Sequence, residues 1–203
     1  MFTILREAYK IALPLFFILN IIGNAPLFIA LLAKYKAKDQ RRIMIREMSV
    51  ALFILLLFFY FGEGILNTLG ISQAVIGIAG GVLLFILSLG MVFPKPHDIE
   101  ASRIEPFIVP LATPGIAGPG AIATVMVYAG FNHPGGSLVV PAAILLAWIP
   151  SLLILLAASN LRLLIGEKGM LACERLGGMI MTLISIQMLT QGIVELVKTS
   201  FKL

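Results

Sequence analysis

The placement of charged residues is the feature that most limits how this chain can fold. Residues 106–161 contain no Asp, Glu, Lys or Arg, and the same is true of residues 11–33, 48–62 and 64–94. A helix needs about 20 largely apolar residues to cross the hydrocarbon core of a bilayer, and charges within such a stretch are costly. These runs therefore predict membrane-spanning helices.

Composition supports the same class. The 203 residues are 60% hydrophobic and 12% charged, whereas soluble domains average about 45–50% apolar and about 25% charged residues. The chain is therefore predicted to be an all-α polytopic membrane protein, with a single transmembrane domain over residues 1–203. The net charge of +5 does not indicate a nucleic-acid partner, because the basic residues lie at the ends of apolar runs.

Six spans are predicted from the apolar runs and the breaks between them. The first run, from residue 11, is too long for the apolar part of a cleavable signal and is expected to remain in the membrane. Polar connections at 94–105 and 162–175 separate the third span from the fourth and the fifth from the sixth. The predicted spans are 11–33, 45–66, 73–93, 106–130, 138–160 and 176–197.

The basic residues also predict the orientation in the membrane. Eleven of the 15 Lys and Arg residues fall in the first, third and fifth connections, and four lie near the two termini. Cytoplasmic connections carry the excess of Lys and Arg. We therefore expect a multi-pass protein of the cell (inner) membrane with both termini outside.

The two halves of the chain suggest an internal repeat. Each half holds three spans, so the second half enters the membrane in the opposite direction from the first, as in an inverted repeat of two three-helix units. The predicted repeats cover about residues 8–94 and 105–198. A shift of about 96 residues places Gly23 and Asn24 on Pro119 and Gly120.

Helix-breaking motifs interrupt the first and fourth spans at these matching places. Gly and Pro free backbone groups, and non-helical backbone survives at membrane depth only where it is packed in protein or lines a polar cavity. Paired breaks in two halves are typical of transporters, and their helix ends could hold the carboxylate and ammonium of a zwitterion. The candidate substrate-binding residues of the motifs are Asn20, Gly23, Asn24, Pro26, Thr113, Pro114, Gly118, Pro119 and Gly120.

Other deep polar groups are few. Gln187 completes the candidate site, and Ser88 lies in the third span; each either lines the cavity or bonds a neighbouring helix. The charged residues at span ends, such as Glu47, are expected to be interfacial anchors. A core without ionisable groups favours a neutral or zwitterionic solute, with any coupling cation held by carbonyl, Asn or Thr oxygens. No cofactor and no metal site are expected, because Cys173 is the only cysteine and the two histidines lie apart.

Several motifs resemble the MarC family of six-span inner-membrane proteins, which includes the SnatA-type neutral amino-acid transporters and is related to LysE-type exporters. The resemblance covers nearly the whole chain. Its motifs are the GNAPLF sequence at 23–28, the RR to RE approach at 41–47, EPFIVPLATP at 105–114, AGPGAI at 117–122, GEKG at 166–169 and ERL at 174–176. Family members often have Pro after the residue equivalent to Asn20, where this chain has Ile21, so the first break is expected nearer Gly23 and Asn24.

The resemblance implies a secondary transporter of small neutral amino acids of the glycine, alanine and threonine class, with alternating access at the broken first and fourth helices. The coupling ion, Na⁺ or H⁺, the direction of transport and a homo-oligomeric state stay open. The alternatives are a membrane scaffold, in which the breaks serve helix packing, and drug efflux. An enzyme is not expected, because the chain has no Ser/His/Asp set, paired deep carboxylates or HExxH motif.

Overall fold

The computed structural model describes residues 2–32, 34–93, 116–130 and 137–201, and these ranges contain helices and no strands. Five helical stretches are long and apolar enough to cross a membrane, and one further apolar helix is shorter. The prediction of an all-α polytopic membrane protein is therefore confirmed. The five stretches are Thr3–Ala25, Ala37–Leu69, Gln73–Val92, Val139–Ala158 and Lys168–Thr199.

The first of these stretches covers nearly all of α1 and the first residues of α2, up to Ala25. The remaining helices follow in chain order, and α6 consists of two helical parts that meet at Gly166, whose φ of 68° and ψ of 178° are not helical. The bounds are α1 Phe2–Leu19, α2 Ile21–Leu32, α3 Ala37–Leu69, α4 Gln73–Val92, α5 Pro119–Ala129 and α6 Val139–Phe201.

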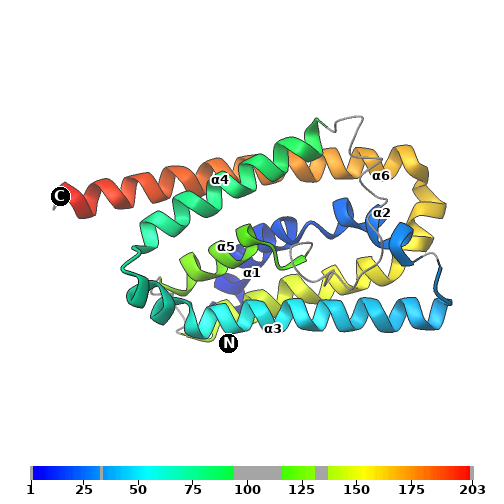
Figure 1. The fold of residues 1–203 in the computed structure, drawn as a ribbon, viewed down its shortest axis with the longest axis horizontal. Helices are drawn as coiled ribbons and strands as arrows, with labels where there is room; N and C mark the ends of the chain where they lie inside the picture. The colour runs from blue at the N-terminus through cyan, green and yellow to red at the C-terminus, as the bar shows by residue number, and fades with distance from the viewer. Residues whose placement is uncertain (1, 33, 94–115, 131–136, 202–203) are drawn as a thin grey trace.

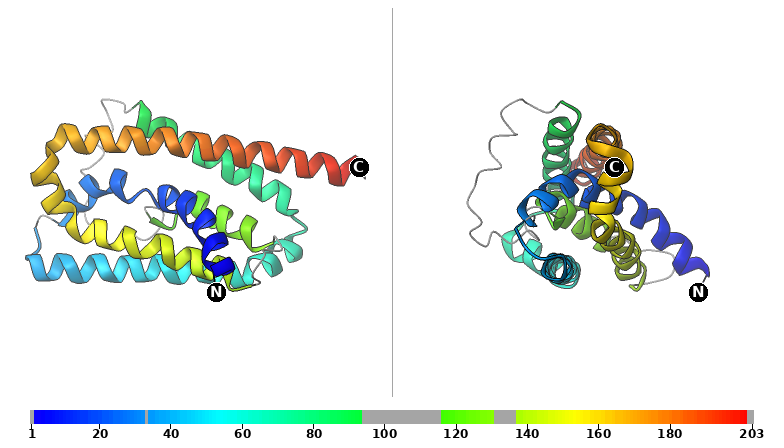
Figure 2. Two further views of the ribbon diagram at one scale, coloured as in Figure 1. Left: turned by 180° about the vertical axis from the view of Figure 1, so that it is seen from behind. Right: turned by 90° about the vertical axis from the view of Figure 1, so that its right-hand side faces the viewer.

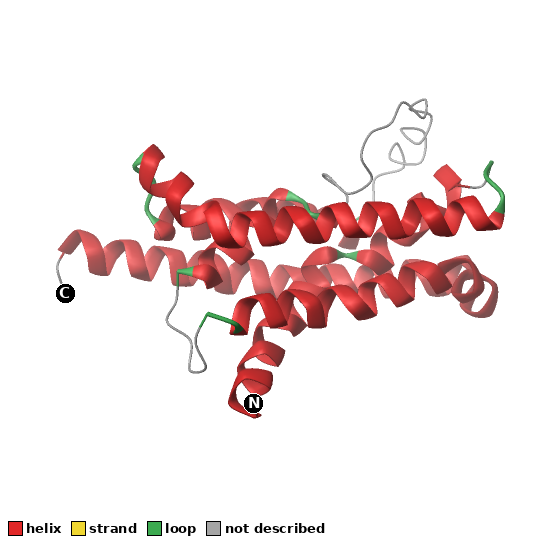
Figure 3. Ribbon diagram, turned by 90° about the horizontal axis from the view of Figure 1, so that it is seen from below, coloured by secondary structure: helices red, strands yellow, loops and turns green. Residues whose placement is uncertain are grey.

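The helices form an elongated bundle in which α2 continues in the direction of α1, and α3, α4, α5 and the two parts of α6 then alternate in direction (Figure 1). In that view α3 lies along the lower edge, α4 and the second part of α6 lie along the upper edge, and α1, α2 and α5 lie between them. Figure 2 shows the same arrangement from behind and from one end. The start of α1 projects from the side of the bundle (Figure 3).

Apolar side chains pack inside the bundle, and many large apolar side chains also lie on its outer surface. Leu15, Met48 and Leu55 are among the buried core residues, with exposed fractions of 1% or less. Phe53 and Leu183 are 66% and 68% exposed. Large apolar side chains on the outside are the expected surface of a protein whose solvent is lipid, since lipid tails are as apolar as leucine.

Most predicted spans agree with the helices, and one connection does not. The third span was predicted at 73–93 and α4 runs over Gln73–Val92, with the Ser72 hydroxyl accepting a hydrogen bond from the Val75 N–H at the helix start. The polar connection predicted at 162–175 lies where two separate spans meet, Val139–Ala158 and Lys168–Thr199, but it is helical on both sides of Gly166 rather than a loop. A single glycine at positive φ is enough to reverse the chain there.

Candidate functional site

The first span is divided at Asn20. This residue has a φ of 50°, in the left-handed region, and it separates α1 from α2. Its N–H donates to the Phe17 carbonyl and its own carbonyl accepts from the Asn24 N–H, each at 3.0 Å. Asparagine tolerates this conformation better than most residues, because its short polar side chain bonds locally. The chain therefore changes course at Asn20 and resumes as a helix at Ile21.

This position corrects the prediction that the break is centred on Gly23 and Asn24. Both of those residues lie in the first turns of α2. The absence of proline at Ile21 does not move the break, because asparagine itself supplies the left-handed residue. Ile21 is instead buried, with 2% of its surface exposed.

Gly23 leaves room for the Asn20 side chain. A Cβ atom added to Gly23 would collide with the amide oxygen of Asn20 and would lie 2.9 Å from its amide nitrogen. The Asn20 amide is therefore held against the first turn of α2, and Asn20, Gly23 and Asn24 are each half-buried. These three predicted site residues are brought together.

Pro26 also belongs to α2, and its side chain lies outside what the structure describes. Its ring nitrogen carries no hydrogen, so the carbonyl of Ile22 has no helical donor four residues on. The backbone around the break thus offers a further acceptor within the first turn of α2.

The second motif forms the start of α5. Gly118 caps the helix in extended conformation, with φ of −73° and ψ of 169°, and Pro119 is its first helical residue. Proline suits this position because the first N–H of a helix has no intrahelical partner. The predicted site residues Thr113 and Pro114 lie outside the residues that the structure describes.

Gly120 marks a close approach between α5 and α4. A Cβ atom there would collide with the δ carbon of Leu84 and lie 2.6 Å from its γ carbon. The Thr124 hydroxyl is buried and donates to the Gly120 carbonyl at 2.8 Å. The hydroxyl therefore bonds its own helix at the shorter distance, and the Met188 sulfur of α6 lies 3.6 Å from it as a weaker acceptor.

Helices α2 and α5 both begin between the two ends of the bundle. From there they run toward opposite ends of the bundle (Figures 1 and 2). The first N–H groups of any helix lack intrahelical partners and carry partial positive charge. The end of α1, just before Asn20, presents carbonyl groups with partial negative charge. Helix ends of both signs therefore occur in the interior, and α1 contacts α5.

Gln187 is not brought to this region. It lies on the exposed side of α6, whereas the next residue, Met188, is 8% exposed and its sulfur lies 3.6 Å from the Thr124 hydroxyl. Successive residues of a helix point in directions about 100° apart, so Met188 faces α5 and Gln187 faces outward. Ser88 is buried and accepts a hydrogen bond from the Thr182 hydroxyl at 2.9 Å.

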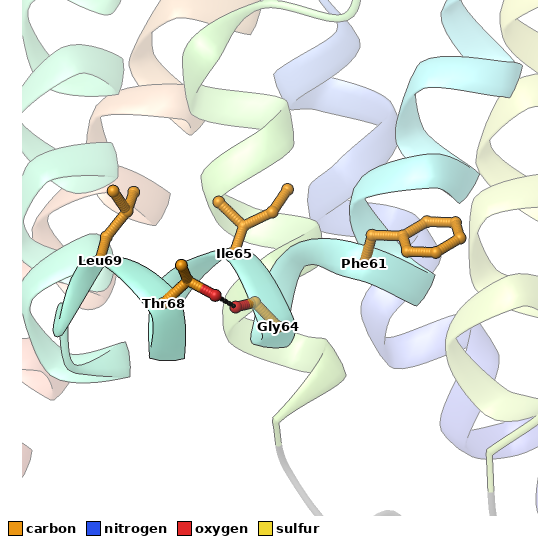
Figure 4. Close-up of a pocket in the computed structure, with 5 residues that line it drawn as sticks. All are labelled: Phe61, Gly64, Ile65, Thr68 and Leu69. Carbon is orange, nitrogen blue, oxygen red and sulfur yellow. Dashed lines mark hydrogen bonds between the residues drawn. The ribbon is translucent and has the colours of Figure 1, made fainter.

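A shallow recess lies elsewhere, at the end of α3 (Figure 4). Its lining comes from one helix: Phe61, Gly64, Ile65, Thr68 and Leu69. The Thr68 hydroxyl donates to the Gly64 carbonyl at 2.8 Å, so it bonds its own helix. This recess contains none of the predicted site residues.

Three polar contacts between helices were not predicted from the sequence. The Gln73 amide donates to the carbonyls of Met126 and Val127 at 3.2 and 2.8 Å, at the end of α5. The Trp148 indole donates to the Met48 carbonyl at 2.7 Å. Each donor is a single polar group in an apolar run, and its partner is a backbone carbonyl far along the chain, so sequence spacing carries no signal of the pair.

Glu47 is the charged residue that is buried within the described part of the chain, with 4% exposed. The guanidinium of Arg46 lies 2.7 Å from its carboxylate, and Arg46 is itself largely exposed. The sequence predicted Glu47 as an interfacial anchor. The structure places its carboxylate inside the bundle, with its ion-pair partner at the surface.

Comparisons with known proteins agree with this architecture. Residues 5–197 match the model described as MarC family integral membrane protein. The protein named UPF0056 inner membrane protein YhgN of Escherichia coli K12 is 38% identical over 193 residues, which are 93% of this chain and 97% of the relative. No solved structure matches the chain.

Two further relatives come from other bacteria. A UPF0056 membrane protein of Buchnera aphidicola from Baizongia pistaciae is 36% identical over 194 residues, 93% of this chain and 97% of its own. A UPF0056 membrane protein of Chlamydia trachomatis is 36% identical over 186 residues, 89% of this chain and 90% of its own. The family match and the relatives extend over nearly the whole of the sequence, and the chain therefore belongs to the MarC family of integral membrane proteins.

Proposed function

We propose that this protein is a secondary transporter of small neutral amino acids, with the substrate held between the Asn20 break and the start of α5. The observation that carries the proposal is that α2 and α5 both begin inside the bundle and run in opposite directions. Helix ends at membrane depth supply partial charges without ionisable side chains. A zwitterion needs both signs of charge within a few ångströms.

The roles of the helix ends follow from their polarity. The N–H groups at the starts of α2 and α5 attract the substrate carboxylate, as helix N-termini attract anions generally. The carbonyl groups at the end of α1 accept hydrogen bonds from the substrate ammonium. The site is built from Asn20, Gly23, Asn24 and Pro26 on one side and from Gly118, Pro119 and Gly120 on the other, with Thr113 and Pro114 as expected neighbours.

The substrate class has two supports. The motifs resemble SnatA-type transporters of neutral amino acids, and residues near the start of α5 leave little space. Ile116, Ala117 and Ala121 are each 2% exposed or less, and Leu84 packs on Gly120. A crowded apolar wall favours glycine, alanine or threonine over larger side chains, and it disfavours a charged one.

Two halves related as an inverted repeat would supply the alternating access. The contact between α4 and α6 supports such a repeat. A shift of about 97 residues places Gly81 on Gly178 and Ser88 on Ser185. A Cβ atom on Gly81 would lie 3.1 Å from the Ser185 carbonyl oxygen. One on Gly178 would lie 3.1 Å from the Ser88 carbonyl oxygen. These contacts are reciprocal, as a two-fold axis between the helices requires.

The turns between the second and third helices of each half add to this support. Gly70 ends α3 with a φ of 66°, and Gly166 divides α6 with a φ of 68°. The two glycines lie about 96 residues apart. In inverted-repeat transporters the halves rock against each other around a fixed site. We propose the same motion here, with both termini outside a cell (inner) membrane.

A thermal-shift screen of the purified protein tests the binding step. Glycine, alanine and threonine are expected to raise the midpoint of thermal unfolding, because a ligand at about 100 times its Kd stabilises the folded state by about 2.7 kcal/mol. Aspartate and lysine should leave the midpoint unchanged. Repeating the screen with sodium, potassium and two pH values distinguishes Na⁺ from H⁺ as the coupling ion. Absence of a shift with every amino acid would favour the scaffold alternative.

A further inference from the structure

Two of the four glutamines in this chain form no hydrogen bond within the part of the chain that the structure describes. Gln40 and Gln73 each donate to two backbone carbonyls, at distances between 2.8 and 3.2 Å. Gln187 and Gln191 both lie exposed on the second part of α6, and neither forms a hydrogen bond with any other described residue. They are four residues apart, so they share one face of the helix.

The depth of Gln187 makes its isolation significant. Residues 176–194 are uncharged, and at 1.5 Å per residue they span about 28 Å, close to the thickness of the hydrocarbon core. Gln187 is two residues from the middle of that stretch, or about 3 Å along the helix axis. An exposed side chain at this depth meets lipid tails, which offer no partner to the two donors and one acceptor of a carboxamide.

The other polar side chains nearby on α6 are satisfied. The Thr182 hydroxyl donates to the Ser88 hydroxyl at 2.9 Å, and the Thr190 hydroxyl donates to the Ile186 carbonyl at 2.8 Å. A short hydroxyl reaches the carbonyl of its own helix, whereas the Gln187 and Gln191 amides extend away from theirs. The unsatisfied groups are therefore confined to the outer face of the helix.

We propose that this face binds a second copy of the chain, with Gln187 of each copy hydrogen-bonded to the other. A carboxamide is its own complement, because its NH₂ donates to the partner's oxygen while its oxygen accepts in return. Copies that insert in the same orientation are related by an axis along the membrane normal, so residues of equal number meet at equal depth. Amide pairs of this kind hold transmembrane helices together.

The neighbours of Gln187 have the spacing of a helix-pairing seam. Exposed residues recur every three or four positions along this face, as in two helices that pack side by side. The seam consists of Leu176, Met179, Leu183, Gln187, Thr190 and Val194. None of these residues belongs to the proposed substrate site, so the dimer does not depend on the transport proposal.

Disulfide cross-linking in membranes tests the position of the interface. Cys173 is first replaced by serine, and Leu183→Cys, one turn before Gln187, is oxidised in proteoliposomes. A covalent dimer is expected. The matched control is Ile86→Cys, which is 60% exposed on α4 and outside the seam, and it should stay monomeric. Equal cross-linking of both variants, or none by Leu183→Cys, would overturn the proposed interface.

Association measured by energy transfer between labelled copies in liposomes tests the amide. Gln187→Leu is expected to weaken dimerisation at least ten-fold, and Gln187→Asn to retain most of it because a carboxamide remains. Thr68→Val, which removes an exposed hydroxyl on α3, should have no effect. A monomer at every protein-to-lipid ratio, or a dimer that Gln187→Leu leaves unchanged, would contradict the proposal. So would a cross-linked product in native membranes whose mass shows a different protein as the partner.

Discussion

At the scale of single residues, the candidate site depends on glycines, which have no side chain, as much as on residues with polar side chains. Gly23 makes space for the Asn20 amide, and Gly120 makes space for Leu84. Asn20 supplies the left-handed conformation that turns the first span. The sequence could show that a break exists here, because Asn and Gly cluster in an apolar run. It could not show which residue turns, since several of them tolerate the conformation.

Gly120→Ala is expected to destabilise the protein by about 1–3 kcal/mol, because the new methyl group overpacks the contact with Leu84. The measurement is the midpoint of thermal unfolding in detergent. Gly64→Ala is the matched control, since a Cβ there meets open space and alanine favours a helix by about 1 kcal/mol over glycine. Adding Leu84→Ala to Gly120→Ala should recover part of the loss. A Gly120→Ala protein as stable as the control would show that the close approach is absent.

At the scale of the helices, the sequence predicted the start of α4 well, where a cap marks it, whereas α3 begins at Ala37, eight residues before the predicted start of the second span. Ser72 caps α4, which begins at the predicted residue. The segment predicted as a connection at 162–175 is helical on both sides of Gly166, which departs from helical geometry, because polar residues alone do not distinguish a loop from a helix. Helix contacts were out of reach for a related reason. The partners of Gln73 and Trp148 are backbone carbonyls, which every residue carries.

The reciprocal contact between α4 and α6 gives a prediction at this scale. Gly81→Val and Gly178→Val are expected to destabilise the protein by similar amounts, each about 1–3 kcal/mol, because each forces a side chain against a carbonyl of the opposite helix. Thermal unfolding of the two variants is the measurement. Gly90→Ala, where a Cβ meets nothing within 4 Å, serves as the control. A large effect at one glycine and none at the other would argue against a two-fold relation between these helices.

At the scale of the whole molecule, five helical stretches are long and apolar enough to cross a membrane, and α5 is a shorter apolar helix within the same bundle (Figure 1). The uneven distribution of Lys and Arg between the connections predicts that the α2–α3 connection faces the cytoplasm and the C-terminus faces outside. Single cysteines at Lys36 and Lys198, in a chain with Cys173→Ser, test this with an impermeant thiol reagent on intact cells. We expect labelling at Lys198→Cys and protection at Lys36→Cys until the cells are opened. The opposite pattern would reverse the orientation.

The central claim is that the backbone around Asn20 and Gly118 binds an amino acid for transport, and counterflow uptake of labelled glycine into proteoliposomes tests it most directly. We predict uptake by the unmodified protein and normal uptake by Gly64→Ala. The rate of uptake should fall at least ten-fold in Asn24→Leu and in Gly118→Leu. The amount of folded protein inserted in the liposomes is measured for every variant. Normal uptake by both leucine variants, or no uptake by the unmodified protein with glycine, alanine or threonine, would contradict the account.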